Sequence, residues 1–156
     1  MSLIDRDRAW CEKVLAAGEV GWLALGGPRP YVIPVNYHWH AGRVLIHTAL
    51  TGRKLEHLAA DERVCFGVGS ALAPLEPHGR GGCYLPWRSV LIEGRARLIR
   101  ETAEKLPLLQ AFLDAYQPED EHGPLTEGDV ANTLLIIIEP EAISGREETG
   151  AEEGGY

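Results

Sequence analysis

Short runs in which apolar and polar residues alternate make up much of the chain, and they predict mainly β-structure. Side chains alternate between the two faces of a strand, so this pattern is typical of strands with one buried face. The unbroken apolar run Leu134–Ile138 indicates a further strand that is buried on both faces. The predicted strands cover residues 20–26, 30–40, 43–49, 63–72, 84–99 and 132–145.

Turn and bulge signals indicate how these strands are connected. Ala41-Gly42 separates residues 30–40 from residues 43–49 and predicts a tight hairpin. Gly94 predicts a bulge or a close backbone approach within its strand. Segments rich in proline, glycine or charge predict loops at residues 73–83 and 117–129.

Three segments have apolar residues at helical spacing. The first lies within residues 5–18, with Asp5 or Asp7 as its N-cap and a glycine at its end. The others are residues 52–62 and residues 101–116, the latter with an internal proline that should kink or restart the helix. Strands interrupted by a few helices predict a mainly β (α+β) fold, a closed or nearly closed antiparallel barrel with peripheral helices.

Length and composition fit one globular domain. The 156 residues are 45% hydrophobic and 24% charged, and no internal repeat is present. We expect a single domain over residues 1–144 and an acidic, solvated and disordered tail over residues 145–156. The formal net charge of −8 argues against nucleic-acid binding, which needs a basic surface.

The apolar runs and the cysteines bear on the cellular setting. The longest apolar run is too short to span a bilayer, and the N-terminus carries no secretory signal pattern. We therefore expect no membrane association and a cytoplasmic location. Cys11, Cys65 and Cys83 form no Cys-x-x-Cys pair, and their odd number suits free thiols.

The first candidate site is the corner Gly52-Arg53-Lys54 at the start of the second predicted helix. Helix N-termini favour phosphate, whereas cations there are unfavourable unless an anion is bound. Gly52 would let a ligand approach the backbone, Arg53 offers a bidentate fork and Lys54 a compact charge. The corner is therefore a phosphate site or a solvated surface loop, and it does not follow the Walker pattern.

Two strand segments offer contacts to a ring. His47 ends its strand, and it is either a structural histidine bonded to backbone or a donor to a ligand ring. Pro34 cannot donate a ladder hydrogen bond, so Ile33–Asn36 should lie on a sheet edge or at a bulge. Free backbone groups on such an edge suit a planar heterocycle, although a plain edge strand would look the same.

Other candidate residues are less specific. Trp87-Arg88-Ser89 could clamp a flat anionic ligand or line a subunit interface. His38 and His40 share one strand face, but no further cluster completes a metal site, so we expect solvent-facing histidines and no metal. No nucleophile elbow or paired cysteine is apparent. These patterns favour binding of a phosphorylated planar ligand over hydrolysis.

Several motifs follow one another in a defined order. They are Pro34-Val35-Asn36-Tyr37, His47-Thr48-Ala49, Gly52-Arg53-Lys54, Arg88-Ser89-Val90 and Glu93-Gly94-Arg95-Ala96. This ordered set resembles the pyridoxamine 5′-phosphate oxidase-related FMN-binding proteins, and most of all their Nim-type (5-nitroimidazole resistance) reductase branch. The resemblance runs from about Asp5 to Ile143. It implies a split β-barrel that forms a homodimer, with FMN held at the dimer interface.

The resemblance also implies a role for each candidate segment. The Arg-Lys pair would bind the FMN phosphate, the strand of Pro34 would follow the isoalloxazine edge, and His47 would lie near the flavin as the best catalytic candidate. The Trp87 segment would reach the cofactor from one of the two subunits. The implied cofactor-binding residues are Ile33, Pro34, Val35, Asn36, His47, Thr48, Ala49, Gly52, Arg53, Lys54, Trp87, Arg88 and Ser89.

The C-terminus departs from the true oxidases. Their basic Arg-x-His-type motif, which docks pyridoxal phosphate, is missing, and the chain ends in EETGAEEGGY. These carboxylates would repel a phosphorylated substrate, so we expect no vitamin B6 oxidase activity.

The leading functional hypothesis is a homodimeric FMN-dependent reductase. It would take electrons from a nicotinamide or another donor and pass them to a small electrophile, such as a nitro compound or a quinone. No GxGxxG fingerprint is present, so a nicotinamide would dock only transiently. The alternatives are a non-catalytic flavin-binding or redox-sensing protein, and a split barrel that binds haem or a deazaflavin through His47 or the His38/His40 face.

Overall fold

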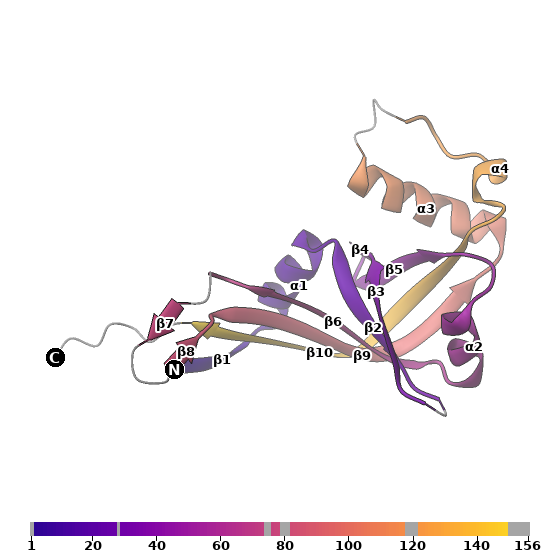
Figure 1. The fold of residues 1–156 in the computed structure, drawn as a ribbon. Helices are drawn as coiled ribbons and strands as arrows, with labels where there is room; N and C mark the ends of the chain where they lie inside the picture. The colour runs from indigo at the N-terminus through magenta and orange to yellow at the C-terminus, as the bar shows by residue number, and fades with distance from the viewer. Residues whose placement is uncertain (1, 28, 74–75, 79–81, 118–121, 150–156) are drawn as a thin grey trace.

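One antiparallel sheet, curled on itself, organises the fold (Figure 1). The computed structural model describes residues 2–27, 29–73, 76–78, 82–117 and 122–149. The strand order is β3-β2-β6-β9-β10-β5-β4, with β1 beside β10 and a separate β7-β8 pair. The strands are β1 (Ser2–Arg6), β2 (Val20–Leu25), β3 (Tyr31–Asn36), β4 (His38–His40), β5 (Arg43–Thr48), β6 (Arg63–Ala71), β7 (Glu76–His78), β8 (Gly82–Tyr84), β9 (Trp87–Ile99) and β10 (Leu134–Thr149). The helices are α1 (Arg8–Ala17), α2 (Arg53–Ala60), α3 (Thr102–Tyr116) and α4 (Glu127–Val130).

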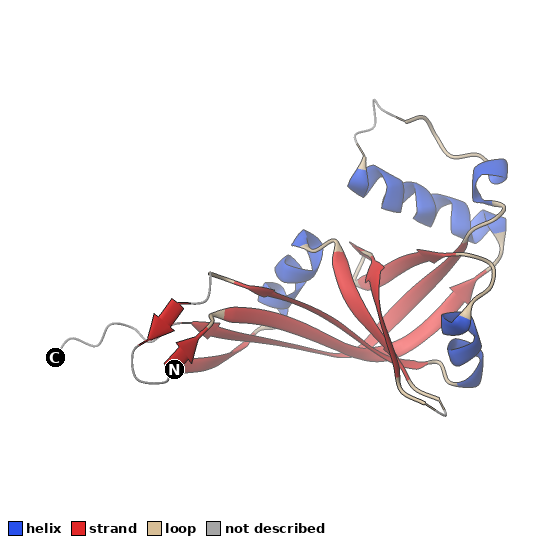
Figure 2. Cartoon of the chain, viewed as in Figure 1, coloured by secondary structure: helices blue, strands red, loops and turns tan. Residues whose placement is uncertain are grey.

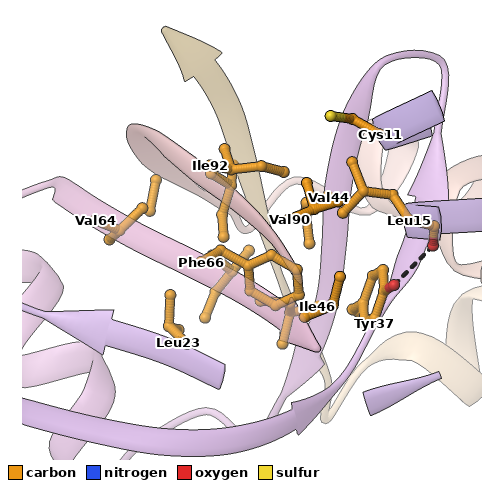
Figure 3. Close-up of a cluster of buried hydrophobic side chains, with 14 of the residues drawn as sticks. Cys11, Leu15, Leu23, Tyr37, Val44, Ile46, Val64, Phe66, Val90 and Ile92 are labelled. Carbon is orange, nitrogen blue, oxygen red and sulfur yellow. Dashed lines mark hydrogen bonds between the residues drawn. The ribbon is translucent and has the colours of Figure 1, made fainter. Parts of the chain in front are cut away.

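The bend at Tyr37 closes the sheet into a barrel. β3 pairs with β2 and β4 pairs with β5, and Tyr37 alone separates β3 from β4. This short segment therefore links the two ends of the strand order. Tyr37 is fully buried, and its hydroxyl donates to the Leu15 carbonyl at 2.7 Å (Figure 3). The predicted mainly β barrel with peripheral helices is confirmed.

Two apolar clusters share the same strands. Ile136 and Ile138 of β10 belong to the interior cluster that contains Phe66. Phe66 and several of its neighbours are labelled in Figure 3. Leu135 and Ile137 face outward, into a second cluster beneath α3. The apolar run in β10 is unbroken because both of its faces are covered, as the sequence predicted.

A long arm extends from the barrel (Figure 2). The second half of β10 pairs with β9 on one side and with β1 on the other. The prediction of a disordered tail from residue 145 is therefore wrong for residues 145–149, which continue β10 to Thr149. Their charges have strand partners, because Glu147 pairs with Arg6 and Arg146 with Asp5. Residues 150–156 lie outside the described part of the chain.

Several local predictions are confirmed. Asp7 caps α1 by accepting from the Trp10 amide. Ala41 and Gly42 both have positive φ, 49° and 78°, as the tight β4–β5 hairpin requires. Gly94 lies opposite the bulge in β10, and a Cβ there would stand 2.2 Å from the Glu139 carbonyl oxygen.

Other local predictions are corrected. The predicted loops contain β7, β8 and the short helix α4, and the N-terminal residues form β1. α3 runs as one helix through Pro107, which is exposed, so the predicted restart does not occur. Within the described ranges, no helix has the length and apolar character needed to cross a membrane.

Candidate functional site

The start of α2 is an open helix N-terminus. Gly52 is the N-cap with φ 139°, it supplies no side-chain cap, and no atom lies within 4 Å of where its Cβ would be. Its carbonyl accepts from the amides of Leu55 and Glu56. The amides of Arg53 and Lys54 precede these and have no intrahelical acceptor. The corner therefore has backbone N–H groups without intrahelical acceptors next to Gly52, and the two residues that carry these amides are cationic.

Tyr31 positions the Arg53 side chain. The Arg53 guanidinium carbon lies 4.1 Å from the centre of the Tyr31 ring, a cation–π contact. Tyr31 lies in turn beside the His57 ring, with centroids 5.2 Å apart. The His57 Nδ1 is 2.7 Å from the Gly26 carbonyl oxygen, which anchors the stack to the end of β2. The guanidinium is thereby held against Tyr31, and among the described residues its N–H groups have no hydrogen-bond or ion-pair partner.

Thr48 leaves a buried hydroxyl without a partner. The residue is 6% exposed, and its Oγ1 has no hydrogen-bond partner among the described residues. A buried hydroxyl in this state is costly unless a ligand or water satisfies it. It belongs to the same strand-to-helix connection as the cation pair. Donors of these kinds fit a phosphate monoester, which offers only acceptor oxygens at neutral pH.

β3 is an edge strand, as Pro34 predicted. Among the described strands it pairs only with β2. Ile33 and Val35 turn toward the barrel core, whereas Pro34 and Asn36 are exposed on the outer face. The side chains available to an outer ligand are therefore Pro34 and Asn36, beside the backbone of the edge.

His47 lies on the outer face of β5, next to α3. Its ring packs edge-on against Phe112, with centroids 4.8 Å apart, and its remaining surface is exposed. Partial burial and, to a smaller extent, the positive charge of Lys54 lower the pKa of His47. The neutral imidazole, with one N–H donor and one acceptor, is therefore favoured at neutral pH.

A cavity of about 460 Å³ joins His47 to Asn36. Its opposite wall is α3, which contributes Leu109, Phe112, Leu113 and Tyr116. The structure thus brings together two predicted site residues from β3 and β5. It also adds an aromatic wall that the sequence interpretation missed, although the spacing of Phe112 and Tyr116 on one helix face was a usable signal.

The predicted Trp87-Arg88-Ser89 segment lies elsewhere. It lies at the start of β9, whereas His47 and α2 lie near the end of β9. At that end, Ile99 of β9 pairs with Leu135 of β10, and Leu135 pairs with His47 of β5. At about 3.3 Å per residue, a strand of this length spans roughly 40 Å. Arg88 instead donates to the Ser70 hydroxyl at 3.2 Å. Within one chain, the segment does not join the site.

The His38/His40 face shows no metal cluster. The two rings lie 5.5 Å apart, and His38 also contacts Phe112. Burial and, secondarily, His40 lower the pKa of His38. In the part of the chain that the structure describes, no group of three or more potential ligands gathers anywhere.

Comparison with known proteins agrees with this geometry. The family profile described as pyridoxamine 5′-phosphate oxidase matches residues 7–147. The chain belongs to this family. The resemblance drawn from the motifs is therefore confirmed at the level of the family, and the barrel is its split barrel. No curated protein matches the sequence significantly.

Solved structures share the fold. A proposed 5-nitroimidazole antibiotic resistance protein from Bacteroides thetaiotaomicron has a TM-score of 0.79 at 17% identity, over 95% of this chain and 92% of that one. An FAD-binding protein from Mesorhizobium loti has a TM-score of 0.69 at 27% identity, over 96% of this chain and 100% of that one. An FAD- and haem-binding protein from Mycobacterium smegmatis has a TM-score of 0.83 at 18% identity, over 99% of this chain and 77% of that one.

Proposed function

We propose that this family member is a homodimeric, FMN-dependent reductase of small electrophiles such as nitro compounds or quinones. The observation that carries the proposal is the α2 corner, where Arg53, Lys54 and the first amides of α2 follow Thr48 in one strand-to-helix connection. Among the described residues, the buried hydroxyl of Thr48 has no hydrogen-bond partner. This donor set suits the terminal phosphate of a flavin mononucleotide. Solved relatives that bind FAD support the flavin, and the phosphate monoester is our reason for preferring FMN.

The roles follow from placement. Arg53 and Lys54 would hold the phosphate, and the open edge of β3 would follow the ring system. His47 would stand near the ring in its neutral form, able to donate one hydrogen bond to a reacting oxygen. Bound flavin would supply the electron transfer, and the chain would supply position and charge.

A dimer would bury an exposed apolar face. Trp22 is 54% exposed and shares a row of the outer sheet face with Gly67 and Leu91, the latter 48% exposed. Val32 and Pro34 continue this face onto β3. We call these five residues the apolar face. Exposed apolar surface of this kind is typical of protein interfaces. A second copy placed here would cover the sheet next to the proposed flavin strand.

The dimer also accounts for the Trp87 segment. Because it lies far along β9 from α2 of its own chain, we propose that it reaches the flavin of the partner subunit. The proposed setting is the cytoplasm, which suits the free thiols of Cys11 and Cys65.

Identification of the copurifying cofactor tests the proposal. We expect a yellow protein that releases FMN, identified by mass spectrometry, whereas a Soret band would overturn the flavin assignment in favour of haem. The double variant Arg53→Ala/Lys54→Ala should fold and lose FMN. The matched control Arg8→Ala/Lys13→Ala removes the same charges from α1 and should keep it. Stoichiometric FMN in the first variant would disprove the phosphate site.

Catalysis needs its own test. Anaerobic bleaching by NADH or NADPH, followed by reoxidation on addition of a nitro compound, would support the reductase. A flavin that neither nucleotide bleaches would favour the alternative, a flavin-binding or redox-sensing protein.

A further inference from the structure

The cavity beneath α3 has the size and walls of a small-molecule site. Its volume of about 460 Å³ falls within the usual range for ligand pockets. Phe112 and Tyr116 stack with an interplanar angle of 10° and a centroid distance of 5.0 Å. Leu109 and Leu113 extend the same wall. A flat apolar molecule would meet aromatic and aliphatic carbon over most of its surface.

Two polar groups in the opposite wall are available to a ligand. The ring nitrogens of His47 and the side-chain oxygen of Asn36 have no hydrogen-bond partner in the described ranges, and both residues line the cavity. The neutral imidazole can donate one N–H to a carbonyl or nitro oxygen. The site therefore combines apolar walls with a few convergent polar groups, the combination expected of a binding pocket.

The charges around the cavity disfavour charged ligands. Asp129 lines it, and hydrogen bonds from the Thr126 hydroxyl and amide lower the pKa of this carboxylate. An anion would be repelled at that side. Lys54 is not part of the cavity lining, but its positive charge contributes to the lowered pKa of His47, so a cation would be repelled near this histidine. An uncharged molecule meets neither penalty.

We propose that this cavity binds an uncharged planar aromatic carbonyl or nitro compound of one or two rings, with His47 donating to its oxygen. The inference rests on the proposed function, because the bound compound would be the electrophile that the flavoprotein reduces. The shared residues Asn36 and His47 place the cavity beside the proposed flavin strand. The electrophile would therefore lie between α3 and His47, and it would be an uncharged aromatic compound.

Binding to the oxidised protein tests the proposal without turnover. We would titrate flavin-loaded protein with menadione in the absence of an electron donor, by calorimetry. Leu113→Trp fills the cavity from a half-buried position, and Ala103→Trp adds the same ring to an exposed position of α3 outside it. We expect one menadione per chain in the wild type and in Ala103→Trp. Leu113→Trp should bind at least about tenfold more weakly.

The outcomes separate this proposal from the proposed function. Equal menadione affinity in the wild type and Leu113→Trp would overturn the pocket, as would tight binding of the anionic analogue 1,2-naphthoquinone-4-sulfonate. Loss of flavin from Leu113→Trp alone would show that the flavin itself fills the cavity, which also overturns it. A wild type that takes up no flavin but binds menadione in this cavity would overturn the proposed function and leave the ligand class standing. Melting curves of both variants check that each is folded.

Discussion

The hydroxyl of Tyr116, in the last turn of α3, donates to the backbone carbonyl of Tyr37 at 2.6 Å. It also lies 2.9 Å from the carbonyl oxygen of Glu19. The Tyr116 side chain thus connects α3, which forms one wall of the cavity, to the bend at Tyr37 that closes the barrel. The Tyr37 side chain, bonded to Leu15, ties the same bend to α1.

Removing the Tyr116 hydroxyl should weaken the attachment of α3 to the barrel. Tyr116→Phe leaves the Tyr37 carbonyl without its donor, and we expect the free energy of unfolding to fall by about 1 kcal/mol, measured by urea denaturation. Tyr31→Phe is the matched control, because no hydrogen bond of the Tyr31 hydroxyl is found within the described residues. Equal stabilities of the two variants would show that the Tyr116 contact contributes nothing.

The histidines beside α3 should make the fold less stable in mild acid. Burial, as the larger cause, lowers the pKa of both His38 and His47 in the folded protein. Below their ordinary pKa of about 6.5, the unfolded chain takes up protons that the folded chain resists. Stability should therefore fall as the pH drops through about 6.5 and stop falling from this cause below the folded pKa values. Denaturation curves at several pH values measure the slope.

The double variant His38→Gln/His47→Gln isolates this effect. It should lower the slope of stability against pH between about 7 and 5, whatever its absolute stability. His122→Gln, in the loop after α3, is the control. A slope unchanged in the double variant would assign the pH dependence to other groups.

The apolar face should mediate the proposed dimer. Trp22→Glu places a carboxylate where a partner would press on the sheet, so we expect a monomer of 17.1 kDa in light scattering, against about twice that mass for the wild type. Ala103→Glu, exposed on α3, should remain dimeric. A dimeric Trp22→Glu protein would mean that the copies meet elsewhere, and the proposed flavin site would need another second wall.

Mixed dimers would show which subunit supplies Arg88. We expect the homodimers of Arg53→Ala/Lys54→Ala and of Arg88→Ala to bind flavin weakly. If each site takes the cation pair from one chain and Arg88 from the other, a tagged heterodimer of the two variants contains one intact site. It should then hold about one flavin per dimer. Absence of flavin from the heterodimer would place all three residues in a site of one chain.

The candidate site was partly predictable because some of its signals are local. Gly52-Arg53-Lys54 was predicted from adjacent residues, and the edge position of β3 from a proline that cannot donate. The aromatic wall was missed because helical spacing shows which face of α3 is apolar, not what lies opposite. Tyr31 was missed for the same reason: its contact with Arg53 joins the start of β3 to α2.

The sequence by itself determined the features that depend on a few neighbouring residues. These are the strand pattern, the β4–β5 turn, the bulge opposite Gly94 and the cation pair at α2. Only the tertiary structure decided that residues 145–149 form a strand, because their partners in β1 are distant in sequence. Arg6 and Glu147, for example, are 141 positions apart. The tertiary structure also decided that His47 and Asn36 share a cavity while Trp87 lies far along β9. Such placements depend on the curl of the whole sheet, which no local pattern encodes.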